Sequence, residues 1–206
     1  MRTIRSVTED EVVAEFLRGE IDSDRWATRI LELLRSDGRA RSIVDHPDLE
    51  DPGANDYRRV LLGRFRGWGR GEGMFPEWFP EGVRWDLVAL TTEELAQVRY
   101  IAWDWWLERS SGSRLAADYA ARIRAGEFPG DPEAGLRDHW PIARRLRDGP
   151  PLPRLIAVRD VRRPDFLVLV EGHVRLTAFF LFPELLPAEL EVFVGTAEGL
   201  NRWGLY

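Results

Sequence analysis

The chain has 206 residues, a length that suits one domain or one domain with a substantial appendage. It contains no Cys, and all 29 residues counted as Lys or Arg are Arg, which excludes thiol nucleophiles, disulfides, Cys-ligated zinc, Schiff-base lysines and phosphate-binding lysines. The net charge of −6 disfavours a protein whose main task is to coat nucleic acid.

The first third of the chain is predicted to be helical. Thr8 and Glu11 have the spacing of a capping box, and the apolar residues after them recur at helical spacing until Gly19. A second helix is predicted from Ser23, as its N-cap, to about Gly38. The N-terminal residues turn acidic before any apolar run, and no run of about 18 apolar residues exists. We therefore expect a cytoplasmic protein that does not partner a membrane.

A Gly-, Pro- and aromatic-rich segment over 63–82 follows a predicted short helix over 57–62. It has no helical or strand period, and it is too long for an ordinary connector. The favoured interpretation is a surface loop whose aromatic rings fill the gap between two layers. The alternative is a functional loop in which Arg64, Arg66 and Arg70 close over phosphates.

Beyond this segment the pattern changes. Residues 84–90 alternate as a strand does, and a helix is predicted to start at Thr91 and to continue through 99–110. The tryptophans of that helix are expected to belong to the core. Ser113 is expected to cap another helix, which ends at Gly126.

The C-terminal residues carry the clearest pattern. Residues 131–153 are predicted to be a linker with one or two helical turns, which Pro141 interrupts. Two strands, a helix entered through a Gly and a third strand are predicted over 153–161, 166–170, 171–182 and 186–194. This order of elements is typical of an α/β fold.

The turn that leads into this last helix combines residues suited to binding phosphate. Gly172 permits a tight turn, and the first N–H groups of the helix have no internal partner, so an anion is favoured there. Arg175 offers a forked cationic donor, and Glu171 could hold a divalent cation or accept a proton. The alternative is that Glu171 caps the helix, His173 lies at the surface and Arg175 pairs with a neighbouring carboxylate.

The motif EGHVRLTA, together with the two strands before it, resembles the signature of the ParB/sulfiredoxin superfamily, whose members carry GxxR at a strand-to-helix turn. The resemblance is strongest over 153–194 and closest to the free-serine-kinase-like members. It implies an α/β fold with a ParB/sulfiredoxin-like small mixed sheet and helices over 83–206, preceded by a helical extension over 1–82 that contains the Gly- and aromatic-rich loop.

The resemblance also implies a ligand. In this superfamily the GxxR turn binds nucleotide phosphates, which implies Gly172 and Arg175 as phosphate contacts and Thr177 as their neighbour on the helix. The cofactors implied are Mg²⁺ and ATP or CTP. A glutamate that assists phosphotransfer in the serine kinases lies early in the fold, and three residues are candidates for it here: Asp86, Glu93 and Glu94.

The chain departs from the superfamily pattern at two positions. His173 stands where sulfiredoxins have their nucleophilic Cys, so thiol chemistry is excluded. Val174 stands where ParB proteins have a second Arg, so one phosphate ligand is missing or comes from elsewhere. Four arginines could supply it: Arg64, Arg66, Arg70 and Arg159. The given chain contains no helix-turn-helix after the signature, so clamping of DNA as in ParB is not expected.

The predicted function is nucleotide binding, with hydrolysis of the nucleotide or transfer of its phosphate to a small molecule. Gly172 and the helix N-terminus would hold phosphate, Arg175 would neutralise developing charge, and Glu171 or His173 would act as base or metal-side ligand, with Glu171 as the metal residue. Two alternatives stay open: a non-catalytic nucleotide-sensing or protein-binding regulator, and a nucleic-acid-processing ParB-like protein. His46 and His139 are expected to be surface residues or satisfied polar contacts.

Overall fold

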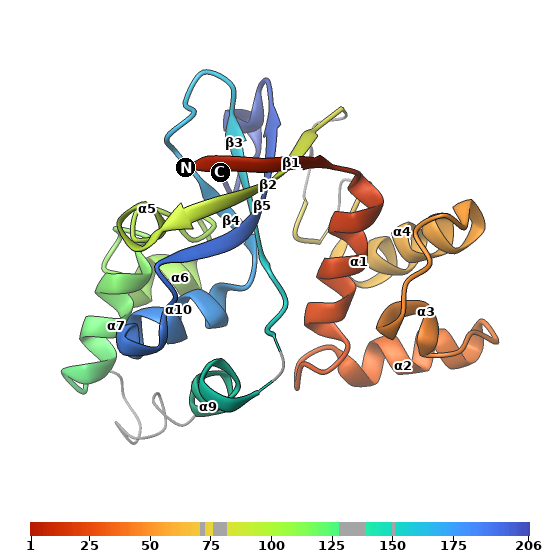
Figure 1. Cartoon of the computed structure of the whole chain (residues 1–206), viewed down its shortest axis with the longest axis horizontal. Helices are drawn as coiled ribbons and strands as arrows, with labels where there is room; N and C mark the ends of the chain where they lie inside the picture. The colour runs from red at the N-terminus through yellow and green to blue at the C-terminus, as the bar shows by residue number, and fades with distance from the viewer. Residues whose placement is uncertain (71–72, 76–81, 128–138, 150) are drawn as a thin grey trace.

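A mixed five-stranded sheet runs through the middle of the molecule in this computed structural model, which describes residues 1–70, 73–75, 82–127, 139–149 and 151–206 (Figure 1). Across the sheet the strands are β1 (Arg2–Val7), β2 (Arg84–Thr91), β5 (Glu189–Ala197), β3 (Leu155–Asp160) and β4 (Val168–Glu171). β3 runs parallel to β5, and the other neighbouring pairs are antiparallel. The predicted α/β class with a small mixed sheet is therefore confirmed.

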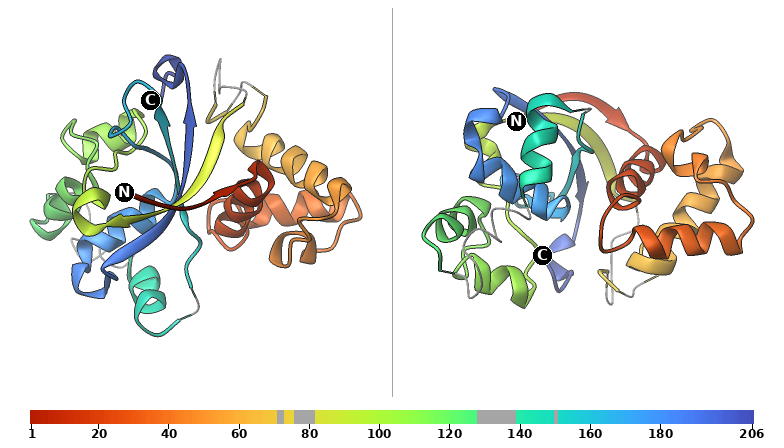
Figure 2. Two further views of the ribbon diagram at one scale, coloured as in Figure 1. Left: turned by 45° about the horizontal axis from the view of Figure 1, so that its top comes forward. Right: turned by 90° about the horizontal axis from the view of Figure 1, so that it is seen from below.

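Helices cover both faces of the sheet (Figure 2). One face carries α1 (Glu9–Glu20), α2 (Ala27–Ser36), α3 (Ser42–Asp45) and α4 (Pro52–Arg66). The other carries α5 (Thr92–Leu95), α6 (Asp104–Arg109), α7 (Ala116–Arg124) and α10 (His173–Leu181), and α9 (Trp140–Asp148) lies below them in Figure 1. Short 3₁₀ helices cover Pro183–Leu185 and Leu200–Arg202. Because both faces are covered, β3 and β4 are almost entirely buried and their sequences are nearly continuous apolar runs.

Aromatic rings fill the space between the N-terminal helices and the sheet. The Trp68 ring lies 6.0 Å from Phe16 of α1, 5.2 Å from Phe75 and 6.2 Å from Trp85 of β2, measured between ring centroids. The described part of the Gly-rich segment therefore has the predicted role, because its aromatic rings fill the gap between two layers. Its first residues, however, belong to α4, which extends through Arg66.

Strand β1 was not predicted, because residues 2–7 are mostly polar and exposed. They become a strand only by pairing with β2, in a register that places Arg2 opposite Ala89 and Val7 opposite Trp85. The segment 1–82 therefore contributes one strand to the sheet of the segment 83–206, and the division of the chain at residue 82 stays a prediction.

The continuous helix predicted from Thr91 to residue 110 is wrong. The capping box of Thr91 and Glu94 forms, but α5 ends at Leu95, and the chain is extended where the Arg99 N–H donates to the Leu167 carbonyl. Leu169 N–H returns a hydrogen bond to the Arg99 carbonyl. Backbone pairing with the chain at β4 therefore overrides local helix propensity here.

Other predicted boundaries also moved. Ser23 and Ser113 each accept a hydrogen bond from a nearby backbone N–H, but α2 and α7 begin three residues after them or later. Pro141 is the second residue of α9 and does not interrupt a helix, because its missing N–H costs nothing in a first turn. The linker predicted over 131–153 lies partly outside the described residues. Of the three tryptophans expected in the core, Trp106 is buried, Trp105 is partly buried against the core, and Trp103 is 42% exposed.

The capping box of α1 provides a direct test of local stability. The Thr8 side chain accepts from the Glu11 N–H at 3.2 Å, and the Glu11 carboxylate accepts from the Thr8 N–H at 3.0 Å. We expect Thr8→Ala to lower the free energy of unfolding by about 1 kcal/mol, measured by urea denaturation. Thr28→Ala, at an exposed position inside α2 without a capping role, should cost nothing; equal losses in both variants would contradict this account.

Candidate functional site

The candidate site begins at the turn between β4 and α10. Gly172 has a φ of +101°, and a Cβ atom built there would lie 2.4 Å from Cδ2 of the buried Leu155. The turn therefore requires glycine. Gly172 is the N-cap residue of α10 and has no side chain that could cap the helix. Anion binding at the first N–H groups of α10 stays a prediction.

Arg175 points back toward the end of β4. Its Nη2 donates to Glu171 Oε1 at 3.0 Å, and both side chains are buried. The Arg175 Nε has no hydrogen-bond partner in the described part of the chain. The alternative in which Arg175 pairs with a nearby carboxylate thus describes this contact correctly, while one buried donor atom of the same guanidinium stays unpaired.

The N-terminal helices add two charged residues to this turn. Arg66, the last residue of α4, places Nη2 3.8 Å from Glu171 Oε2 and Nε 3.3 Å from Oε1 of Glu20, the last residue of α1. A Cβ at Gly19 would lie 3.1 Å from Arg175 Nη1, so the end of α1 packs directly against that guanidinium. We call Glu20, Arg66, Glu171 and Arg175 the charge cluster.

Arg66 is thus the one of the four candidate arginines with a contact to Glu171 among the residues that the structure describes. Arg64 instead bonds Asp37, and Arg159 donates to Thr196 and to the Pro164 carbonyl. Arg70 lies beside Gly63, where its Nε would be 3.0 Å from a Cβ. Sequence reasoning left the choice open because α4 was not expected to reach residue 66.

Glu20 was missed altogether. The available signal was its position, since a carboxylate at the C-terminal end of a helix is opposed by the helix dipole and needs another reason to be there. Burial and the neighbouring charge of Glu171 raise the pKa of Glu20 to about 7, while Arg66 opposes the shift. The charge cluster therefore exchanges a proton near neutral pH, and it gains positive charge when Glu20 is protonated.

His173 lies between Glu171 and Arg175 in the chain, and its ring belongs to an aromatic stack. Its ring centroid is 4.9 Å from that of Trp106 and 5.7 Å from that of Tyr100, with nearly parallel planes. Burial and the positive charges of Arg66 and Arg175 lower the pKa of His173 to about 3, so the imidazole is neutral at pH 7. Its Nε2 is buried without a hydrogen-bond partner among the described residues. The alternative interpretation that placed His173 at the surface is wrong, and the predicted role of His173 as base or metal-side ligand stays a prediction.

Thr177 holds α10 in place. Its buried hydroxyl donates to the His173 carbonyl at 2.9 Å and lies 2.7 Å from the Tyr100 hydroxyl. These contacts hold the first turn of α10 against the chain at Tyr100. Thr177 therefore positions the His173 stack, and its predicted place as a neighbour of phosphate stays untested.

A metal ion would find two carboxylates at this site. Within the described ranges no three or more His, Asp or Glu side chains form a group that could hold a metal alone. Mg²⁺ usually needs only one or two carboxylates together with substrate phosphates and water. Glu171 and Glu20, on either side of Arg66, supply that number, so the residues fit Mg²⁺ that arrives with a phosphate ligand.

The other predicted candidates make their contacts elsewhere in the fold. Asp86 accepts from the Ser6 hydroxyl at 2.9 Å, and Glu94 caps α5 and pairs with the N-terminal amine. His46 is exposed, and His139 is buried with its ring edge-on to Tyr119 at 6.4 Å. In the part of the chain that the structure describes, no contact joins these residues to the charge cluster.

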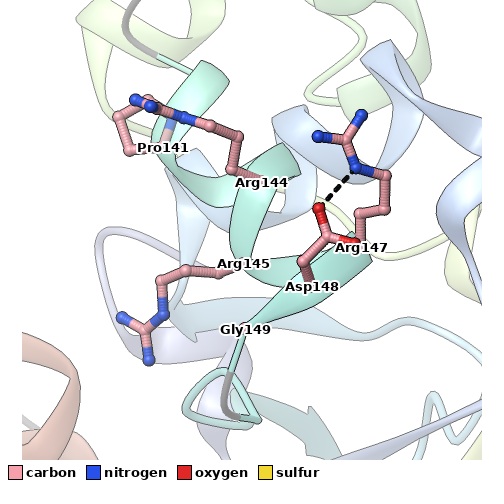
Figure 3. A pocket seen from close by; sticks show the side chains of 6 residues that line it. All are labelled: Pro141, Arg144, Arg145, Arg147, Asp148 and Gly149. Atoms are coloured by element: carbon pink, nitrogen blue, oxygen red, sulfur yellow. Dashed lines mark hydrogen bonds and ion pairs between the residues drawn. The ribbon is translucent and has the colours of Figure 1, made fainter.

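An arginine-rich surface lies on α9. A pocket of about 440 Å³ is lined by Pro141, Arg144, Arg145, Arg147, Asp148 and Gly149 (Figure 3). Arg147 turns to Asp148, with Nε 2.7 Å from the carboxylate, while the side chains of Arg144 and Arg145 extend in different directions. Because these arginines do not converge, this surface lacks the built geometry of the charge cluster.

Comparison with known proteins adds no assignment, because no protein-family model, curated protein or solved structure matches this chain. Among the described helices, none combines the length and apolar character needed to cross a bilayer. The charge cluster and the motif at the β4–α10 turn are therefore the features that bear on function.

Proposed function

We propose that this chain has a ParB/sulfiredoxin-like fold and binds a nucleoside triphosphate, ATP or CTP, at the β4–α10 turn, where it hydrolyses the nucleotide or transfers its phosphate to a small molecule. The observation that carries the proposal is the convergence of the buried guanidinium of Arg175 and the partly buried guanidinium of Arg66 on Glu171, beside the uncapped N-terminus of α10. Buried arginines and free helix N–H groups together are a strong anion site.

Each residue of the turn has a role in this proposal. The N–H groups that begin α10 bind a phosphate oxygen, and Gly172 lets that oxygen come close to the backbone. When phosphate binds, some N–H groups of Arg175 and Arg66 donate to the phosphate oxygens instead of the carboxylates, and the two positive charges neutralise the phosphate. Mg²⁺, held by Glu171 when the nucleotide brings it, would supply further neutralisation of the phosphates, and Glu20 stays free of the metal.

The proton of an attacking water or acceptor needs a base. Glu20, with a pKa of about 7, is better suited to that task than His173, whose pKa of about 3 makes it a weak base. Both carboxylates of the cluster are ion-paired in the absence of ligand, however. That pairing supports the alternative of a nucleotide-sensing regulator, in which the same turn binds nucleotide without turnover.

A thermal-shift panel of ATP, CTP, GTP and ADP, each with and without Mg²⁺, tests the proposal. A nucleotide at 100 times its dissociation constant should stabilise the protein by about 2.7 kcal/mol. We expect Arg66→Gln to weaken nucleotide binding at least tenfold, because one of two phosphate donors is lost. Arg64→Gln is the matched control, since Arg64 lies on the same helix but bonds Asp37.

The outcomes separate the candidate functions. Absence of any nucleotide shift in the wild type would refute the phosphate site, and equal binding by the Arg66 and Arg64 variants would place it elsewhere. The melting temperature of each unliganded variant serves as the folding control. Release of inorganic phosphate from a nucleotide that binds would favour the enzyme, and binding without release in the presence of acceptors would favour the regulator.

A further inference from the structure

A row of alternating guanidinium groups and indole rings leads from the charge cluster to the surface. The Cζ atom of Arg66 lies 5.4 Å from the ring centroid of Trp26. The Cζ atom of Arg25 lies 5.1 Å from the same ring and 5.9 Å from the ring of Trp103. The Trp103 ring in turn stacks on Trp105, with centroids 6.5 Å apart and planes 23° apart.

Arg25 is held in this row by aromatic rings alone. In the described part of the chain its guanidinium makes no hydrogen bond and no ion pair, and the residue is exposed. Stacking of a cation on exposed rings is a weak interaction, so the group is readily displaced. The two rings that hold it come from the segment before α2 and the residue before α6, which belong to opposite faces of the sheet.

Trp103 presents its indole at the surface. It is 42% exposed, and its side chain makes no capping hydrogen bond to α6. Its neighbours lead back to the candidate site, since Trp105 contacts Trp106 at 4.2 Å and Trp106 stacks on His173. The positive charge of Arg25 also contributes to the lowered pKa of His173. The exposed indole therefore lies on the same side of the molecule as the β4–α10 turn.

We propose that Trp103 and Arg25 together form the base subsite of the bound nucleotide. The base stacks on the indole of Trp103, and the Arg25 guanidinium covers its other face in place of its present contact. Every nucleobase has an aromatic face and arginine stacks on such faces, so this subsite adds affinity without strong choice among bases. The inference rests on the proposed function, because the phosphates of the same ligand occupy the charge cluster.

Calorimetric titration of the full chain with ATP and with tripolyphosphate, both with Mg²⁺, tests the subsite. We expect the wild type to bind ATP about tenfold more tightly than tripolyphosphate. Trp103→Leu should lower ATP affinity about tenfold and change tripolyphosphate affinity less than twofold. Trp103→Phe should keep ATP affinity within about threefold of the wild type, because a smaller ring still stacks. Trp140→Leu is the control, since Trp140 is 48% exposed on α9 and stacks on Phe182.

The results that would refute the base subsite differ from those that would refute the phosphate site. If the wild type binds ATP and tripolyphosphate equally, or if Trp103→Leu weakens both to the same extent, the base subsite is refuted while phosphate binding stands. ATP binding that survives Trp103→Leu unchanged has the same meaning. If the wild type binds neither ligand, the proposed function fails, and the base subsite fails with it.

Discussion

Replacing Gly172 by alanine is expected to lower the free energy of unfolding by about 3 kcal/mol. The backbone there has a φ of +101°, which costs a residue with a Cβ roughly 1–2 kcal/mol or more. The added Cβ would also lie 2.4 Å from Cδ2 of Leu155. Because Leu155 is buried in the core, it cannot move aside without disturbing its neighbours, which adds about 1–3 kcal/mol.

Gly38 provides the matched control for Gly172. It also has a positive φ, of +65°, but a Cβ there would meet nothing within 4 Å. Gly38→Ala should therefore cost only about 1 kcal/mol, and the difference between the two variants in urea denaturation reports the clash and the more extreme φ. Similar losses in both variants would show that the β4–α10 turn does not need glycine for close packing.

Glu20→Gln is expected to remove a large pH dependence of stability. The folded-state pKa of Glu20 is about 7, above the ordinary value of 4.5, so the folded protein holds this proton more tightly than the unfolded chain does. Protonation of Glu20 therefore contributes stability that is fully present below about pH 4.5 and is lost as the pH rises through about 7. At about 1.4 kcal/mol per pKa unit, the loss is on the order of 3 kcal/mol.

Denaturation of wild type and variant at several pH values between 4.5 and 8 checks this prediction. Glutamine resembles the protonated carboxyl, so Glu20→Gln should gain stability relative to the wild type as the pH rises. Glu32→Gln, which removes an exposed carboxylate on α2, is the control and should follow the wild-type profile. A Glu20→Gln profile parallel to that of the wild type would show that Glu20 is ionised throughout this range.

The C-terminal strands and α10 were predictable because their signals are local. β3 and β4 are short apolar runs, and Gly172 marks the one position where a tight turn into a helix was required. The capping boxes at Thr8 and Thr91 were equally local, since each joins two residues three positions apart. Such patterns hold whenever nothing more distant competes with them.

The charge cluster was only half predictable. Glu171 and Arg175 lie on one turn of chain, so their contact follows from a spacing of four residues. Glu20 and Arg66 end two helices that come from other parts of the chain, and they meet Glu171 only because the aromatic rings of Phe16, Trp68 and Trp85 pack α1 and the segment after α4 against the sheet. No local pattern contains that packing.

The sequence by itself determined that anion chemistry cannot use lysine and is left to arginine, histidine and backbone N–H groups, and that thiol chemistry is absent. It also predicted that a strand, a glycine and a helix N-terminus meet at Gly172. Only the tertiary structure decided which arginine joins Arg175, that His173 is buried in an aromatic stack, and that residues 2–7 are a strand. Composition and short spacings depend on the chain alone, whereas the ion pairs, burial and strand partner each depend on segments brought together by folding.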